Sequence, residues 1–152
     1  MGTDIMFTVE RRRSDGKWER AEPLVPNPYQ GEFEDDYPHF STLHGEYVHE
    51  SWSFFPRDRW IDCTNWNHQH PLPEDASRET FEYLTAWTDD LQRMVLLRDL
   101  EETDWMAAYY YPWPQDPEER SQYVLSIRQA VLDRLRPLGG PDDVRLIYGW
   151  NG

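Results

Sequence analysis

Two histidines one residue apart, His68 and His70, have the types and spacing that most suggest chemistry in this chain. They lie in the stretch CTNWNHQHP, residues 63–71, which begins with the thiol of Cys63. Imidazole and thiolate are both zinc ligands, but alternate residues of an extended segment point to opposite faces. A tetrahedral site also needs further ligands, and none lies at a recognised spacing. The pattern therefore favours a polar loop, and we expect neither a bound metal nor another cofactor.

A weaker cluster of histidine and acidic residues precedes this stretch. His44 and His49 flank the sequence GEYV, with Glu50, Asp58 and Asp62 nearby. Residues five apart share neither a strand face nor a helix face, so the signal for a common site is weak. If these groups worked with the later histidine pair, the chain would be a small metal-dependent hydrolase or transferase. We keep that as an alternative function.

Three other features have plain structural explanations. Cys63 as a nucleophile would need an adjacent base and a lowered pKa, and a buried, inert thiol is the more common case. Asp4 and Glu10 could share a strand face and act as paired carboxylates, but two ordinary surface acids are favoured in so acidic a chain. The pair Gly139-Gly140 follows a helix pattern, where glycine ends helices, and it is not a phosphate-binding loop.

Aromatic residues are abundant, with eight Trp, nine Tyr and six Phe. They gather in the groups SWSFF, DRW, TNW and YYYPWP. Such groups either pack under loops or line a binding surface, where aromatic residues and arginine are enriched. Arginine beside tryptophan suits a planar or anionic ligand. The predicted ligand- or partner-binding residues are Arg57, Arg59, Trp60, Trp66, His68 and His70.

The charge balance restricts the partners. Fifteen basic and 29 acidic residues give a formal charge of −14, which repels nucleic acid and anionic lipid. We therefore expect no direct nucleic-acid binding. No stretch is long and apolar enough to span a membrane. A single cysteine and the lack of a signal-peptide pattern favour the cytoplasm.

Periodicity predicts the elements that must position these residues. Residues 4–11 alternate as a strand, Asp15-Gly16 marks a tight turn, and residues 17–22 return as a second strand. A middle strand is expected around residues 46–54. Residues 78–101 are expected to be helical, with a possible break at residues 88–90. One buried stripe would contain Leu84, Trp87, Leu91, Met94 and Val95.

The C-terminal part gives the clearest helix. Asp116 is expected to cap it, Pro117 occupies the first helical position, and Glu119 would complete a capping box. Residues 144–150 alternate as a closing strand. The 152 residues are sufficient for one domain. We predict an α+β fold in which a small antiparallel sheet, made of the hairpin, a middle strand and the closing strand, is covered on one face by two or three helices, with long aromatic-rich loops.

Three segments together carry a resemblance. They are MGTDI leading into a strand that contains Val9-Glu10, LPEDAS before a helix, and PDDVRLIYGWNG at the end. They resemble a family of small uncharacterised phage and bacterial proteins that open Met-Gly-Cys-Asp-Ile-His or Met-Gly-Thr-Asp-Ile-His and close with an Asp-Asp-Val-Arg strand. The match covers about a third of the chain, and it implies that the first and last strands are central in the sheet.

The chain departs from that family at two positions. Met6 stands where the family's opening strand has a histidine, and Leu91 replaces a histidine ahead of a helix. If those histidines form a site in relatives, this chain has lost it. The expected function is therefore a non-enzymatic, phage-like binding protein that engages a host protein or a small ligand. A dedicated nucleotide or small-molecule binder is a further alternative.

Overall fold

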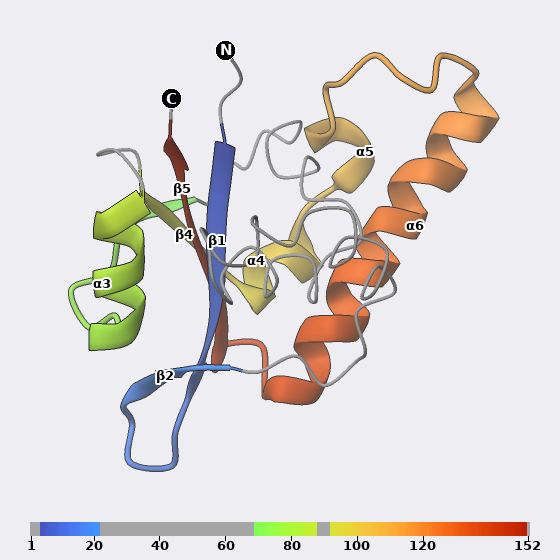
Figure 1. Ribbon diagram of the computed structural model, residues 1–152. Helices are drawn as coiled ribbons and strands as arrows, with labels where there is room; N and C mark the ends of the chain where they lie inside the picture. The colour runs from blue at the N-terminus through green and yellow to red at the C-terminus, as the bar shows by residue number, and fades with distance from the viewer. Residues whose placement is uncertain (1–3, 22–68, 88–91, 152) are drawn as a thin grey trace, which may run out of the picture.

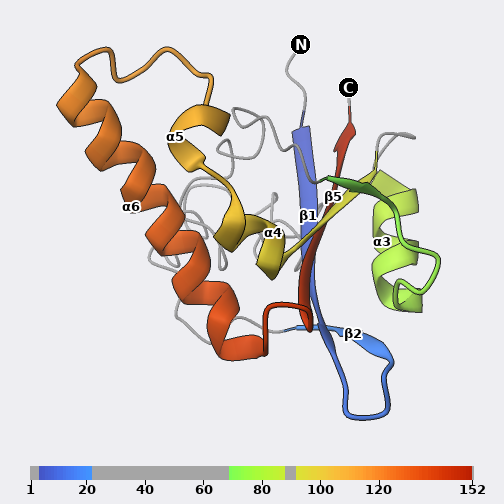
Figure 2. The same cartoon turned by 180° about the vertical axis from the view of Figure 1, so that it is seen from behind.

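The protein is described here from a computed structural model, which describes residues 4–21, 69–87 and 92–151. Five strands form one antiparallel sheet in the order β2-β1-β5-β4-β3. Helix α3 lies on one face of this sheet, and α4, α5 and α6 lie on the other (Figures 1 and 2). The α+β class predicted from the sequence is confirmed, but the helices cover both faces and not one.

The N-terminal hairpin forms where the sequence predicts it. β1 spans Asp4–Arg12 and β2 spans Trp18–Arg20. The amide of Gly16 donates to the carbonyl of Arg13, and Gly16 has a φ of 83°. Glycine reaches this left-handed conformation at no steric cost, which is why Asp-Gly is a strong turn signal.

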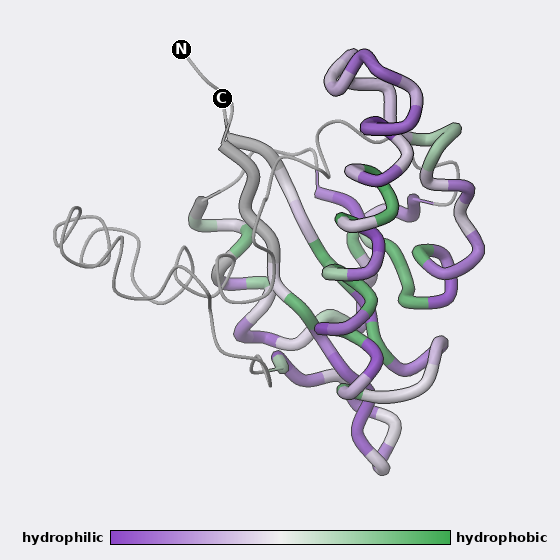
Figure 3. The backbone as a smooth tube through the Cα atoms, turned by 90° about the vertical axis from the view of Figure 1, so that its right-hand side faces the viewer, coloured by the Kyte–Doolittle hydropathy of each residue, from purple (hydrophilic) through white to green (hydrophobic). Residues whose placement is uncertain are grey.

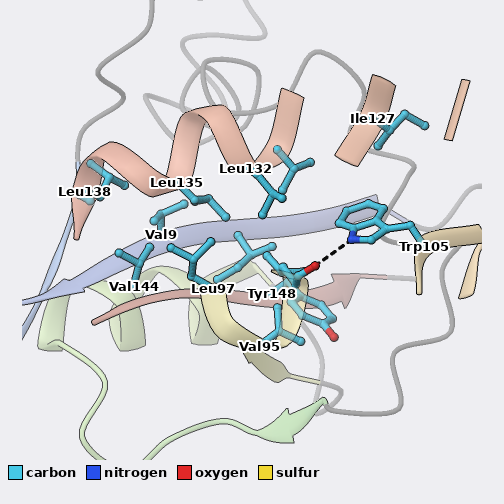
Figure 4. Close-up of a cluster of buried hydrophobic side chains, with 14 of the residues drawn as sticks. Val9, Val95, Leu97, Trp105, Ile127, Leu132, Leu135, Leu138, Val144 and Tyr148 are labelled. Carbon is cyan, nitrogen blue, oxygen red and sulfur yellow. Dashed lines mark hydrogen bonds between the residues drawn. The ribbon is translucent and has the colours of Figure 1, made fainter. Parts of the chain in front are cut away.

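The central strand is β5, Val144–Asn151, which pairs with β1 on one side and with β4, Arg93–Leu96, on the other. Val144, Leu146 and Tyr148 alternate toward the face that α6 covers, where they join the main core. Figure 4 shows the side chains of Val144 and Tyr148 with Val9, Val95 and the α6 residues Leu132 and Leu135. The period of two in the sequence therefore does set the buried face of the closing strand.

The helix predicted over residues 78–101 is only partly correct. α3 spans Arg78–Trp87, but β4 follows, and α4 begins at Leu97 and ends at Glu102. The expected stripe is wrong beyond α3, because Met94 packs with Leu84 under α3 while Val95 lies in the core on the opposite face. Adjacent residues on opposite faces indicate a strand, and pairing with β5 outweighs the helical spacing. The short β3, His70–Pro71, closes this edge.

The C-terminal helices carry most of the second layer. α5 spans Trp105–Ala108, α6 spans Pro117–Leu135, and the 3-10 helix η2, Arg136–Leu138, leads back toward β5. Hydrophilic and hydrophobic residues alternate along α6 (Figure 3). Its buried residues include Val124, Ile127 and Val131, as the sequence predicts. The middle strand expected around residues 46–54 lies outside the described residues.

The first turn of α6 has the predicted cap at Asp116, but the Glu119 side chain does not bond back to the cap residue, so the expected capping box is incomplete. A carboxylate oxygen of Asp116 accepts a hydrogen bond of 3.0 Å from the amide of Glu119, and Pro117 follows the cap. We expect Asp116→Ala to lower the free energy of unfolding by about 1 kcal/mol, the usual cost of removing a cap. Chemical denaturation measures the difference, with Gln122→Ala on the exposed side of the same helix as the control. An unchanged midpoint for Asp116→Ala would contradict this assignment of the cap.

Candidate functional site

Of the six residues predicted to bind a ligand or partner, His70 is the one that the structure describes. Its Nε2 lies 3.2 Å from a carboxylate oxygen of Asp99, and the same oxygen accepts a bond from the amide of Leu96 at the start of α4. His70 thus contacts the acid that caps α4. This contact holds β3 against α4 and needs no ligand to explain it.

The other five predicted residues, Arg57, Arg59, Trp60, Trp66 and His68, lie outside the described residues, as do Cys63, His44 and His49. Their roles stay predictions. Within residues 4–21, 69–87 and 92–151, no three His, Cys, Asp or Glu side chains gather closely enough to hold a metal ion. In the described part of the chain, no helix is long and apolar enough to cross a membrane.

The sheet carries a buried ion pair on the face that α3 covers. Arg145 of β5 stands directly opposite Glu10 of β1, and two guanidinium nitrogens donate to one carboxylate oxygen at 2.9 and 2.7 Å. The Glu10 side chain is 0% exposed and the Arg145 side chain 3% exposed. The prediction that Glu10 is an ordinary surface acid is therefore wrong, since the carboxylate is held in the interior by its cation.

The second carboxylate oxygen of Glu10 faces the start of α3. It accepts hydrogen bonds from the amide of Ser77 at 2.8 Å and from the hydroxyl of Thr80 at 2.9 Å. A buried charge is tolerated when such bonds replace its water. Because four donors already occupy the two oxygens, this carboxylate is committed to joining β1, β5 and α3 and not to acid-base chemistry.

Arg145 is enclosed in a similar way. Its guanidinium carbon lies 3.8 Å from the ring centre of Trp18 in β2, and its remaining terminal nitrogen donates to Asp75 at 2.9 Å. The indole covers the cation while the carboxylates neutralise it. Sequence reasoning missed this cluster because its members lie up to 135 residues apart. The available signal was a charged residue in each of two alternating strands, Glu10 and Arg145.

Removing one charge of this pair should lower the free energy of unfolding far more than removing both charges. We expect Arg145→Met to lower the free energy of unfolding by about 3–5 kcal/mol, because it leaves a buried carboxylate without its cation. In Glu10→Gln/Arg145→Met the amide oxygen still accepts from α3 and no charge is stranded. The double variant should therefore lose less than the two single variants combined, by at least about 1.5 kcal/mol.

The control cycle uses Arg11 and Glu19, an exposed pair at 3.0 Å between β1 and β2. Its coupling energy should stay below about 1 kcal/mol. Urea denaturation of both cycles measures the comparison. Equal coupling in the buried and exposed pairs would contradict the role assigned to Glu10 and Arg145.

A second feature lies between α5 and α6, in the segment that we call the aromatic loop, residues 109–116. Tyr110 is 63%, Tyr111 46% and Trp113 55% exposed, although each is a large aromatic residue. The sequence left open whether YYYPWP packs in the core or forms a surface. The structure places Tyr109 in the core and these three aromatic residues at the surface.

The aromatic loop is held firmly to the helices that flank it. Asp104 caps α5 through the amides of Met106 and Ala107, and the buried Tyr109 packs edge-on against Tyr123 of α6 with ring centres 6.1 Å apart. Arg120 of α6 donates to the backbone carbonyls of Tyr109 and Tyr111. The same guanidinium lies over the ring of Tyr109, 5.2 Å from its centre. These contacts fix the backbone, so the exposed rings need little further ordering to bind.

No protein-family model, curated protein or solved structure matches the chain. The resemblance of its terminal segments to small phage and bacterial proteins therefore stays a prediction. The aromatic loop is the described feature that best supports a binding role.

Proposed function

We propose that the protein is a non-enzymatic binding module that engages a partner protein through its aromatic loop. The observation that carries the proposal is the exposure of Tyr110, Tyr111 and Trp113 on a backbone anchored by Arg120. Water-exposed aromatic side chains are unfavourable for an isolated protein, and tyrosine and tryptophan dominate the energetics of protein interfaces.

The contacts that anchor the loop support this role. A flexible loop loses conformational entropy when it binds, and a preorganised one loses less. The buried Tyr109 and the cap at Asp116 restrain the loop at its two ends. Tyrosine and tryptophan add large contact area with few side-chain torsions to restrict. The loop joins the outer ends of α5 and α6, away from the sheet, which suits contact with another macromolecule (Figure 1).

The kind of partner and the cellular compartment are proposed from the sequence. The resemblance to small phage and bacterial proteins supports a bacterial host protein as the partner. The single cysteine of the chain, Cys63, supports a reducing cytoplasm as the place of action. The net charge of −14 argues against a nucleic-acid partner.

Site-specific crosslinking tests the proposal. A benzophenone amino acid in place of Tyr111 should form one dominant adduct in bacterial lysate on irradiation, because the residue would lie within the interface. The same group in place of Phe81, which is 51% exposed on α3, is the matched control. Trp113→Ala should remove the adduct at position 111 and leave the melting temperature unchanged. Equal adducts at both positions, or none at position 111, would contradict the proposal.

The Arg57–Trp66 segment, which lies outside the described residues, stays a second predicted recognition site. Arginine beside indole in Arg59-Trp60 would add contacts worth about 0.5–2 kcal/mol each to a planar or anionic group of the partner. We expect Arg59→Ala/Trp60→Ala to weaken partner binding while the melting temperature is retained. A large fall in melting temperature would show instead that these residues stabilise the fold.

A further inference from the structure

The charges around the aromatic loop specify the chemistry of its partner. From residue 99 to residue 119 the chain has no Lys, Arg or His. The acidic residues of this stretch are Asp99, Glu101, Glu102, Asp104, Asp116, Glu118 and Glu119. Two of them, Glu101 and Glu102, face Arg136 and Arg98 in ion pairs. The carboxylates nearest to the loop in sequence are Asp104, Asp116, Glu118 and Glu119.

Among the described residues, no cation pairs with these four carboxylates. Asp104 and Asp116 accept bonds from helix amides, which leaves their negative charge in place. Glu118 and Glu119 are exposed in the first turn of α6. Arg120 follows directly, but it is turned to the carbonyls and ring of the loop itself. In the described part of the chain, the exposed rings therefore stand between acids that have no cationic partner.

The β1–β2 hairpin differs from the aromatic loop in its charges. Five basic residues lie in the β1–β2 hairpin: Arg11, Arg12, Arg13, Lys17 and Arg20. Each arginine there already meets an acid, with partners Glu19, Asp143, Asp15 and Glu79 respectively. Figure 1 places this hairpin and the aromatic loop at opposite ends. Among the described residues, the cations thus neutralise acids at the hairpin end, while the four carboxylates beside the loop have no cationic partner.

We propose that the aromatic loop binds a Lys- or Arg-rich segment of a partner polypeptide, an inference that rests on the proposed function and specifies its partner. Such a segment can place its cations over the faces of Tyr111 and Trp113, where the ring quadrupole attracts them. Its remaining cations form ion pairs with Glu118 and Glu119 beside the rings. The aliphatic stems of lysine and arginine cover the apolar area of the rings.

Synthetic peptides of defined charge test this inference directly. Hexa-arginine, hexa-lysine, hexa-glutamate and a Gly-Ser hexamer are titrated into uniformly ¹⁵N-labelled full-length protein. The cationic peptides should shift the indole N–H signal of Trp113 and the amides of residues 109–119. Hexa-glutamate and Gly-Ser should leave them in place. Because exposed charge pairs are screened, raising the salt concentration should weaken the cationic binding.

Variants separate a specific site from general attraction to an acidic protein. Trp113→Ala keeps the charge and should weaken hexa-arginine binding by about fivefold, as expected for one cation–π contact. Glu118→Gln/Glu119→Gln keeps the rings and should weaken it by about the same factor, as expected for two exposed ion pairs. Glu74→Gln/Asp133→Asn removes two exposed acids elsewhere and should have little effect. Each variant is first checked for an unchanged melting temperature.

Several results would overturn the inference. Equal weakening by the two double variants would mean that the peptides follow net charge alone. Equal binding of Gly-Ser would mean that the rings accept an uncharged chain. If no peptide binds while the adduct at position 111 still forms, the partner is not basic and the proposed function stands. If the adduct also fails to form, the proposed function fails with the inference.

Discussion

The buried pair of Glu10 and Arg145 is the interaction on which the rest of this fold depends. The two residues lie directly opposite in β1 and β5, with Val9 and Leu146 as the next opposed pair along the same strands. A slip of β1 by one residue would move Glu10 into the apolar core under α6 and would leave Arg145 without its carboxylate on the other face. The pair therefore fixes the register of the two central strands, and its bonds to Ser77 and Thr80 place α3 over them.

The aromatic loop depends on that register through the opposite face of the sheet. Val9, Leu146 and Tyr148 form the apolar surface against which α4, α5 and α6 pack. Trp105 of α5 lies in the same core (Figure 4) and donates its indole N–H to the carbonyl of Leu100. α5 and α6 in turn hold the two ends of the loop. The molecule thus uses one face of the sheet to set its architecture and the other to support a candidate binding surface.

The sequence predicts those parts of the structure that depend on local patterns. The Asp15-Gly16 turn, the cap at Asp116 and the alternation of Val144, Leu146 and Tyr148 each reflect the preferences of neighbouring residues. The helical interpretation of Met94 and Val95 is wrong because the spacing of apolar residues cannot reveal that β5 lies alongside and offers backbone partners. The ion pair joins residues distant in the chain, and only the sheet brings them together.

The sequence predicts the general type of surface at the candidate site, but not which aromatic residues are exposed there. An aromatic, acidic surface follows from composition, and YYYPWP is one of the aromatic groups that the sequence shows. That Tyr109 would be buried and the next two tyrosines exposed depends on how α6 packs, and on Arg120 reaching back to the loop carbonyls. These are tertiary contacts between residues in different elements, and no local pattern encodes them.

The central claim is that a rigid scaffold presents the exposed rings of residues 109–116. The most direct test is the ¹⁵N relaxation of these backbone amides in the free protein, compared with those of α6. The account predicts order parameters near about 0.85, the value typical of rigid backbone, in both segments. Values below about 0.6 in the loop, with α6 rigid, would contradict it.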